Sequence, residues 1–335
     1  MNAIHPIAAE VRTIAEGQKI TEPGVYDLPI EIYHSQICDG PSLSSTGIRR
    51  ILQSPANYWK HSELNPHRVD EEDKEAFILG RAAHHLLLGE REFGKRFIIQ
   101  PSTYEDRKTG EEKPWNGNAT VCRDWKAAQA KSGKTILTPT QIEKIKGMAG
   151  LLPWQEGMTN CGLRNTPLVM AGALSGEIER SLFWKQGNVW LKSRPDAIPG
   201  SSDDFADLKT ISPRSGVGIS DYDLERAVRE SRYFVQGAMV GMAASAVLNR
   251  TMAGFHLIFV DTGDVHAVSP ITVDDEDLIR GERAVFAAVA IFERCLKTGI
   301  WPGPTARQAD ARKLPIHQWG RDAFDRHLDI LESEI

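Results

Sequence analysis

Two short motifs in the middle of the chain constrain its fold more strongly than any other feature. Arg194-Pro195-Asp196 is followed, eleven residues after its acid, by Asp207-Leu208-Lys209-Thr210. On a β-strand, Asp207 and Lys209 project from one face and Leu208 from the other, because successive side chains alternate. Asp196, at the end of a neighbouring strand, adds a second carboxylate to the same edge. The motifs therefore predict adjacent strands that gather two acids and one lysine at one rim.

Such a rim suits the hydrolysis of a phosphodiester. Two carboxylates can hold a hard divalent cation such as Mg²⁺, which polarises the phosphate and activates water, while the ammonium offsets developing negative charge. A D-x-K triplet by itself is more often an ordinary set of charges on a surface hairpin. Further residues with matching chemistry are therefore needed before a nuclease is inferred.

The composition is that of an ordinary globular enzyme, with 335 residues, 41% hydrophobic and 25% charged. A net charge of −5 is not that of a general nucleic-acid coating protein. It is compatible with a DNA enzyme, because acids gather at metal sites while basic residues line one channel. No apolar run reaches the roughly 18–20 residues of a membrane span, and the N-terminus lacks a signal pattern. We therefore expect a cytoplasmic protein without a membrane partner.

Two other motif classes are excluded by their spacing. Cys38, Cys122, Cys161 and Cys295 are scattered and form no C-x-x-C, so we expect neither disulfides nor a zinc or iron–sulfur site. The run 132–135 reads Ser-Gly-Lys-Thr, but Ala128 stands where a P-loop needs glycine, and the run follows a helix. We therefore expect no ATP site.

Helices and strands alternate in a way that predicts layers. Helices are expected at 42–60 (capped by Ser44 or Ser45, with a second turn from Pro55), 77–88, 138–152, 222–248, 274–298 and 322–334. The helix at 77–88 is apolar nearly all round and should be buried. Runs at 168–171, 178–184, 189–194 and 205–209 predict a β-meander, and further strands are expected at 254–261 and 265–271. The fold class is α/β (α+β layered), a central mixed β-sheet flanked by helices.

The domain organisation follows from the same pattern. Residues 1–36 carry mixed signals and are expected to form a loosely packed N-terminal lead-in. Residues 37–302 form a single domain, and 303–335 a C-terminal extension. Within the domain, about 101–133 is rich in Lys, Glu, Gly and Asn and is broken by prolines. We expect it to be a mobile excursion with a partly helical stretch at its end.

Three more residues extend the constellation. His84 lies on the apolar helix, where an imidazole is usually a core residue unless acids converge on it. Glu179 opens a strand, and Gln236 lies on the helix that follows the D-x-K strand, where its amide can bond a phosphate oxygen or the attacking water. Each residue alone is weak evidence. Their order, from His84 through Glu179, Asp196, Asp207 and Lys209 to Gln236, is hard to obtain by chance.

That order resembles the PD-(D/E)XK nuclease superfamily and, more closely, the RecE-type phage and prophage exonucleases, also called exonuclease VIII. The similarity covers about 32–302. It includes Tyr33-His34, Ser42-Leu43-Ser44, the Ser54-Pro55 helix with Trp59, the G-x-x-x-H helix at 80–84, and 133–138. It continues through Glu179 with Trp184, the two motifs above, the run 233–236 and Trp301-Pro302.

The resemblance implies a PD-(D/E)XK restriction-endonuclease-like core. It implies an ATP-independent, Mg²⁺-dependent enzyme, with Mn²⁺ as a substitute, that digests linear double-stranded DNA 5′→3′ and leaves 3′ single strands. Asp196 and Asp207 become metal ligands, completed or supported by His84 and Glu179. Lys209 orients or stabilises the nucleophilic water, and Gln236 positions it. A homo-oligomeric ring, trimer or tetramer, and a single-strand annealing recombinase as partner are implied by analogy, and one or two metal ions remain open.

The serine-rich helix start carries a second candidate site. Arg49 and Arg50, with Ser44 nearby, could bind the 5′-phosphate of a DNA end through their charge and the amides of the helix end. Two exposed arginines without a ligand are an equally good reading.

Two other functions are compatible with the sequence. The first is an endonuclease of the same superfamily; a helicase-associated nuclease with an iron–sulfur cluster is disfavoured, because only Cys295 lies near the C-terminus. The second is a catalytically silent DNA-binding protein on this fold. Two acids facing phosphate without a metal would repel DNA, which argues against it.

Overall fold

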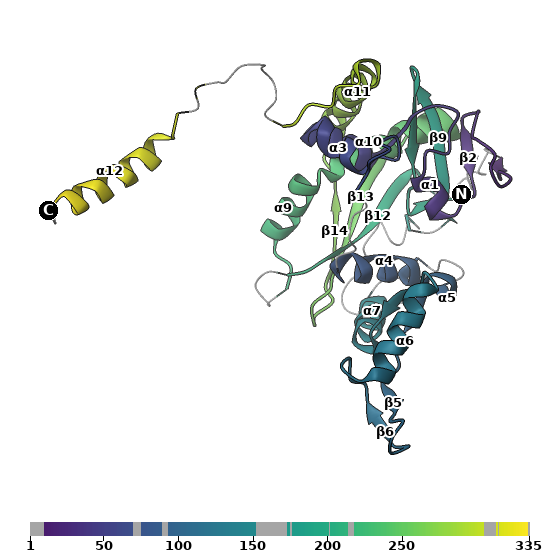
Figure 1. The fold of residues 1–335 in the computed structure, drawn as a ribbon. Coiled ribbons are helices and arrows are strands. Elements are labelled where there is room, and N and C mark those ends of the chain that lie inside the picture. Colours follow the sequence, from purple (N-terminus) through teal and green to yellow (C-terminus); the bar gives the residue numbers. More distant parts are fainter. Residues whose placement is uncertain are drawn as a thin grey trace.

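The computed structural model describes residues 10–69, 75–88, 93–151, 173–174, 176–200, 202–213, 218–304, 313 and 315–333. Its helices are α1 (Ile30–His34), α2 (Ser45–Gln53), α3 (Pro55–His61), α4 (Glu75–Leu87), α5 (Phe93–Arg96), α6 (Thr120–Lys131), α7 (Pro139–Leu151), α9 (Asp221–Ser231), α10 (Tyr233–Ala243), the π-helix η1 (Ala244–Leu248), α11 (Asp275–Thr298) and α12 (Gln318–Ser333). Its strands are β1 (Val11–Arg12), β2 (Gly24–Tyr26), β3 (Ser42–Ser44), β4 (Phe97–Ile99), β5 (Thr103–Glu105), β6 (Glu112–Pro114), β7 (Thr135–Leu137), β8 (Glu177–Ile178), β9 (Ser181–Gln186), β10 (Val189–Ser193), β11 (Ala197–Ile198), β12 (Asp204–Ile211), β13 (Gly254–Asp261) and β14 (Val268–Thr272). Figure 1 shows strands at the centre with helices on either side.

A five-stranded mixed sheet, in the order β1-β2-β9-β10-β3, forms one half of the core. The β9 and β10 strands make an antiparallel hairpin that turns at Gly187 (φ 61°), while β3 joins β10 in parallel. Both faces of β9 are covered. Leu182 and Trp184 face the main core, and Phe183 packs against Tyr26 and Tyr33 of the N-terminal segment.

A second mixed sheet, β12-β13-β14, carries the D-x-K motif. Parallel pairing of β12 with β13 needs a crossover, which α9, α10 and η1 provide. Every residue of β13 is buried, as expected for a strand with helices on both faces. Phe255, Leu257 and Phe259 face the cluster that includes α10 and α11, whereas Ile258 and Val260 face the cluster formed with α4 and α7. The motif strand β12 is therefore paired with a strand that is packed on both faces.

The structure confirms the α/β fold with mixed sheets and several of the expected helices. Ser44 accepts a bond from Gly47 N at 3.3 Å and caps α2, and α3 begins at Pro55. Asp274 caps α11, which ends as expected at Thr298. The helix at 77–88 is only partly buried, since Arg81 and Leu86 are exposed.

Two expectations are corrected, and a third cannot be compared with the structure. Residues 24–34 are not loosely packed, because β2 pairs with β9 and residues such as Val25, Leu28 and Tyr33 are buried. The meander holds only for the β9–β10 hairpin, since β12 pairs with β13 instead. The expected run at 168–171 lies outside the described residues.

The long helix expected at 222–248 is also corrected, because it is broken at Arg232. This residue adopts the left-handed conformation (φ 51°, ψ 47°) and separates α9 from α10, and the last turn of the second piece is the π-helix η1. Arg49 Nη1 donates to Ser231 O at 2.7 Å and satisfies a carbonyl at the end of α9. This contact from a distant helix supplies the partner that a continuous helix would otherwise provide.

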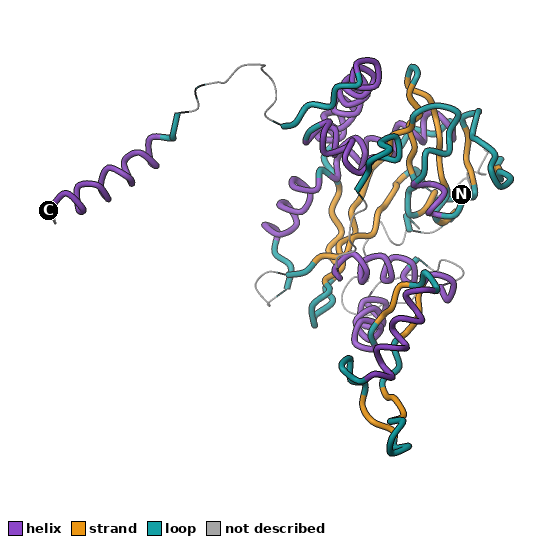
Figure 2. The backbone as a smooth tube through the Cα atoms, in the orientation of Figure 1, coloured by secondary structure: helices purple, strands orange, loops and turns teal. Residues whose placement is uncertain are grey.

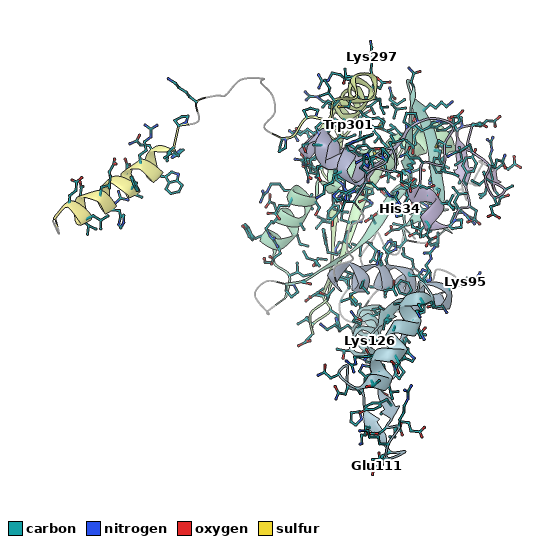
Figure 3. All side chains as sticks on the ribbon, in the orientation of Figure 1. His34, Lys95, Glu111, Lys126, Lys297 and Trp301 are labelled. Carbon is teal, nitrogen blue, oxygen red and sulfur yellow. The ribbon has the colours of Figure 1, made fainter. Side chains whose placement is uncertain are left out.

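Residues 97–137 form an arm that projects from the body. Figure 2 shows the hairpin β5–β6 and helix α6 extending beyond α4, and Figure 3 places Glu111 at the far end of the arm and Lys126 on α6. The hairpin is antiparallel, β4 pairs in parallel with β7, and Trp115 meets Trp125 edge to face at 5.4 Å between ring centroids. The excursion expected at 101–133 is therefore built from a hairpin and a helix.

The C-terminal part begins with an aromatic contact and ends with an exposed helix. Trp301 stacks on Trp59 with ring centroids 4.5 Å apart and so ties the end of α11 to α3. Nearly all side chains of α12 are exposed. Among the helices that the structure describes, none has the length and apolar character of a membrane span. Cys38, Cys122 and Cys295 are buried free thiols.

Candidate active site

The site residues come from five separate places in the fold. His84 is on α4, Glu179 follows β8, Asp196 lies between β10 and β11, Asp207 and Lys209 are on β12, and Gln236 is on α10. Two hydrogen bonds of Asp196 connect it to Glu179 and to the D-x-K strand. Glu179 N bonds Asp196 O at 3.1 Å, and Leu208 N donates to Asp196 Oδ2 at 2.5 Å. The second bond places the carboxylate of Asp196 against the backbone of the D-x-K motif itself.

His84, Glu179 and Asp196 form a group that could hold a metal ion. One ligand atom from each of the three lies within 4.8 Å of the others. The imidazole sits between the two acids, with Nδ1 at 3.3 Å from Glu179 Oε1 and Nε2 at 2.9 Å from Asp196 Oδ1. Their side chains are mostly buried. An imidazole on an apolar helix was expected to be a core residue unless acids converge on it. Two acids do converge on His84.

Asp207 lies beside this group but is not part of it in the described structure. Gln236 Nε2 donates to Asp207 Oδ1 at 2.5 Å, and the other carboxylate oxygen makes an ion pair with Lys209. The structure thus brings Asp207, Lys209 and Gln236 together. The expected pairing of Asp196 with Asp207 as joint ligands stays a prediction.

Each of the three acids has its own basic partner. Asp196 is paired with His84, Asp207 with Lys209, and Glu179 with Arg194. Three carboxylates packed this closely would repel one another, so these partners make the arrangement possible before any cation binds.

The pKa shifts follow from that pairing. Burial raises the pKa of Asp207 to about 6, with the charge of Asp196 adding to the effect. Burial would also raise the pKa of Asp196, but His84 and Lys209 outweigh it and the pKa is lowered. Burial opposes the charged form of Lys209, yet Asp207 and Asp196 outweigh it and raise the pKa of the ammonium. Lys209 is therefore a stable cation at neutral pH, suited to stabilising negative charge and unsuited to accepting a proton.

Two residues around the site had no role assigned from the sequence. Arg194, in the R-P-D motif, binds Glu179. The ring of Tyr233 lies 5.0 Å from Lys209 Nζ and 6.0 Å from Arg49 Cζ, within range of a cation–π contact. The motif itself pointed to Arg194, but nothing in the sequence showed which side chain it would meet.

Two of the three residues expected at a DNA 5′-phosphate, Arg49 and Arg50, line a separate pocket. A cavity of about 290 Å³ is lined by Thr46, Arg49, Arg50, Gln53, Asn57, Glu230, Ser231 and Arg232. The guanidinium of Arg49 donates hydrogen bonds to Ser45 O, Thr46 Oγ1 and Ser231 O. Ser44 does not line the pocket, because its hydroxyl caps α2. Arg232, which the sequence did not suggest, supplies a third guanidinium.

The donor set of the triad fits a divalent metal ion. Carboxylate oxygens suit Mg²⁺ and Mn²⁺, and a neutral imidazole adds a nitrogen ligand that Mn²⁺ accepts readily. A cation held by His84, Glu179 and Asp196 would polarise a phosphate and activate water. The Lys209 ammonium lies next to this position.

Comparison with known proteins agrees with the fold. A crystal structure from Eubacterium rectale, described as that of a candidate exonuclease, superimposes with a TM-score of 0.53 at 14% identity, covering 89% of this chain and 98% of that one. No curated protein sequence matches the chain. The sequence profile described as "PDDEXK-like domain of unknown function (DUF3799)" matches residues 44–314. Fold and family together support a nuclease. The chain belongs to this family of PDDEXK-like domains.

Proposed function

We propose that the protein is an ATP-independent exodeoxyribonuclease that needs Mg²⁺, with Mn²⁺ as a substitute. It digests linear double-stranded DNA 5′→3′ and leaves 3′ single-stranded overhangs for recombination. The observation that carries the proposal is the buried group of His84, Glu179 and Asp196 beside the Lys209–Asp207 pair. A site for hydrolysing a phosphodiester needs a cation position and a fixed ammonium next to it, and this group supplies both.

The catalytic residues have separate tasks in this proposal. Asp196, Glu179 and His84 would hold the cation, and Asp207, now paired with Lys209, would be a further ligand. Lys209 stabilises the negative charge that develops on the phosphate, and its raised pKa keeps it protonated. Gln236, which already donates to Asp207, holds that carboxylate in place and positions the nucleophilic water.

The arginine-lined pocket supports the direction of digestion. Arg50 and Arg232, with the remaining donors of Arg49, would bind the terminal 5′-phosphate of a DNA strand, while Ser44 fixes the start of α2. The contacts of Tyr233 with both Arg49 and Lys209 link the pocket to the active site. A terminal phosphate held there would present a nearby phosphodiester to Lys209.

Three further expectations belong to the proposal; the cytoplasmic setting rests on the sequence pattern, and the others rest on resemblance to the RecE-type exonucleases. They are a homo-oligomeric ring around the duplex, a single-strand annealing recombinase as partner, and a cytoplasmic setting in a phage or prophage system. A ring would keep the enzyme on its substrate through many cycles.

One experiment separates the alternatives. End-labelled linear duplex and covalently closed circular DNA are each incubated with the protein, with Mg²⁺ and with EDTA. The proposal expects Mg²⁺-dependent loss of the 5′ label from linear DNA and no nicking of the circle. Nicking of the circle would instead identify an endonuclease. Binding without cleavage in Mg²⁺ or Mn²⁺ would identify a silent DNA-binding protein, and either result would overturn the proposal.

A further inference from the structure

Arg194 makes more contacts at the site than a simple ion pair. Its Nε donates to Glu179 Oε2, and its Nη1 donates to Leu28 O at 2.8 Å and Ser181 Oγ at 2.9 Å. Its Cζ lies 5.8 Å from the centroid of the Tyr33 ring. Only 8% of its side chain is exposed. The guanidinium is thus held by the N-terminal segment at Leu28 and by the stretch 179–181, and among the described residues its charged partner is Glu179.

Glu179 needs an external partner more than the other acids do. Its backbone has φ 56°, a conformation that residues other than glycine rarely adopt. The residue sits in a turn between β8 and β9, so neither strand sets the direction of its side chain. One oxygen of its carboxylate meets Arg194 and the other lies 3.3 Å from His84 Nδ1. The position of Glu179 Oε1 in the metal-capable group therefore depends on Arg194.

We infer that Arg194 is a positioning residue of the metal site: through Glu179, it fixes one of the ligands that receive the divalent cation. The inference rests on the proposed function, because it takes the group of His84, Glu179 and Asp196 as the metal site. Among the described residues, the hydrogen bonds of Arg194 go to Glu179, Leu28 and Ser181, so it acts on the site through Glu179. Outer partners of this kind typically change metal affinity about 10- to 100-fold when they are removed.

The chain provides a matched control two residues away. Lys192 is also buried, also faces the N-terminal segment and also lies over the Tyr33 ring, at 5.5 Å. Its Nζ donates to Ser35 O at 2.7 Å and His34 O at 3.3 Å. These hydrogen bonds go to backbone carbonyls and not to the Glu179 carboxylate. Lys192→Met therefore removes a buried cation two residues from Arg194, beside the same Tyr33 ring, without changing a proposed ligand.

The test measures Mn²⁺ binding to the full chain by titration calorimetry, together with thermal unfolding. We expect wild type and Lys192→Met to bind Mn²⁺ with similar affinity, and Arg194→Ala to bind it about 10- to 100-fold more weakly. Arg194→Lys should also bind more weakly, because an ammonium cannot reproduce the fork that joins Glu179, Leu28 and Ser181. Millimolar guanidinium, but not sodium chloride at equal ionic strength, should restore part of the affinity of Arg194→Ala.

The possible failures are distinct. If folded Arg194→Ala binds Mn²⁺ as wild type does, or if its loss is no larger than that of Lys192→Met, Arg194 is only a structural tie and the inference is wrong. If Arg194→Ala does not fold, Arg194→Lys decides in the same way. If wild type itself binds no Mn²⁺, the proposed metal site is wrong and the inference with it. Wild-type binding with unchanged Arg194 variants would leave the proposed function standing.

Discussion

Lys209 and Asp207 carry the sharpest prediction at the scale of single residues. Both Lys209→Ala and Asp207→Ala should abolish DNA degradation in Mg²⁺ while the fold is retained. Removing one preorganised charge from a transition state typically costs about 10²- to 10³-fold in rate, and a lost ligand adds to that. Degradation of end-labelled duplex measures the effect, and circular dichroism checks the fold. Lys297→Ala, on the exposed end of α11 away from the arm (Figure 3), is the matched control. Near wild-type activity in either site variant would contradict the assigned roles.

Lys192 gives a prediction about pH and stability. Burial lowers its pKa from 10.5 to about 8, so the unfolded chain binds a proton more strongly than the folded one between these values. The folded state is therefore penalised below pH 8 and gains stability as the pH rises from about 8 to 10, by up to about 1.4 kcal/mol per unit.

This gain should be missing in Lys192→Met. Urea unfolding of both proteins at several pH values in this window measures it, and the difference between the two slopes isolates the contribution of Lys192 from those of other titrating groups. Parallel slopes for the two proteins would show that the lysine keeps its ordinary pKa.

Glu179 is expected to separate stability from metal binding. Because its backbone is left-handed, Glu179→Gly should be more stable than Glu179→Ala, by about 1 kcal/mol. Both variants should lose Mn²⁺ affinity equally, since both lack the carboxylate. Urea unfolding and titration calorimetry measure the two effects. Glu177, two residues earlier in β8, does not have a positive φ, so there the order of the glycine and alanine variants should reverse. If the alanine variant were more stable than the glycine variant at residue 179 as well, residue 179 would carry no backbone strain.

At the scale of helices and strands, the sequence predicted best where the signal is local. Asp274 and Ser44 cap helices through bonds to residues a few positions away, and such signals are visible in the sequence. The break at Arg232 has no glycine or proline to mark it and depends on Arg49, which lies far away in the chain. The parallel pairing of β12 with β13 is equally long-range, which is why alternation alone suggested a meander.

The candidate site divides along the same line. The residue types and order of His84, Glu179, Asp207 and Gln236 predicted one site, because each side chain can bind a metal ion, a phosphate or the attacking water. Which acid pairs with which base depends on side-chain geometry across several elements. The separation of Asp207 from the metal-capable group and the contact of Arg194 with Glu179 could therefore emerge only from the structure.

The packing of α10 tests how the site depends on its supporting helix. A Cβ added at Gly237 would lie 2.5 Å from the Phe255 ring and 2.8 Å from Leu278, whereas one at Gly241 meets only the flexible end of Met252, at 3.0 Å. Gly237→Ala should therefore destabilise the fold by about 1–3 kcal/mol. It should also lower nuclease activity, because Gln236 next to it would move away from Asp207.

Gly241→Ala, one turn along the same helix, is the matched control. It should be neutral or stabilising by up to about 1 kcal/mol, since alanine favours the helix. Thermal unfolding and the DNA degradation assay compare the two variants. Equal stability of both would show that α10 has room to shift towards solvent.

At the scale of the whole molecule, the two ends of the chain should behave differently. Residues 24–34 pair with β9, fill the core with Val25, Leu28 and Tyr33, and supply the carbonyl of Leu28 to Arg194. Removing residues 1–36 should leave a chain that is insoluble or lacks a cooperative unfolding transition, because it uncovers buried apolar surface and deprives Arg194 of a partner. A chain that ends at residue 304 retains the stacking of Trp301 on Trp59 and lacks residues 305–335, which include α12, whose Trp319 and Phe324 are 71% and 61% exposed. Its unfolding temperature and Mn²⁺ affinity should equal those of the full chain. A cooperatively folding chain that starts at residue 37 would instead show that the nuclease core is complete without its N-terminal segment.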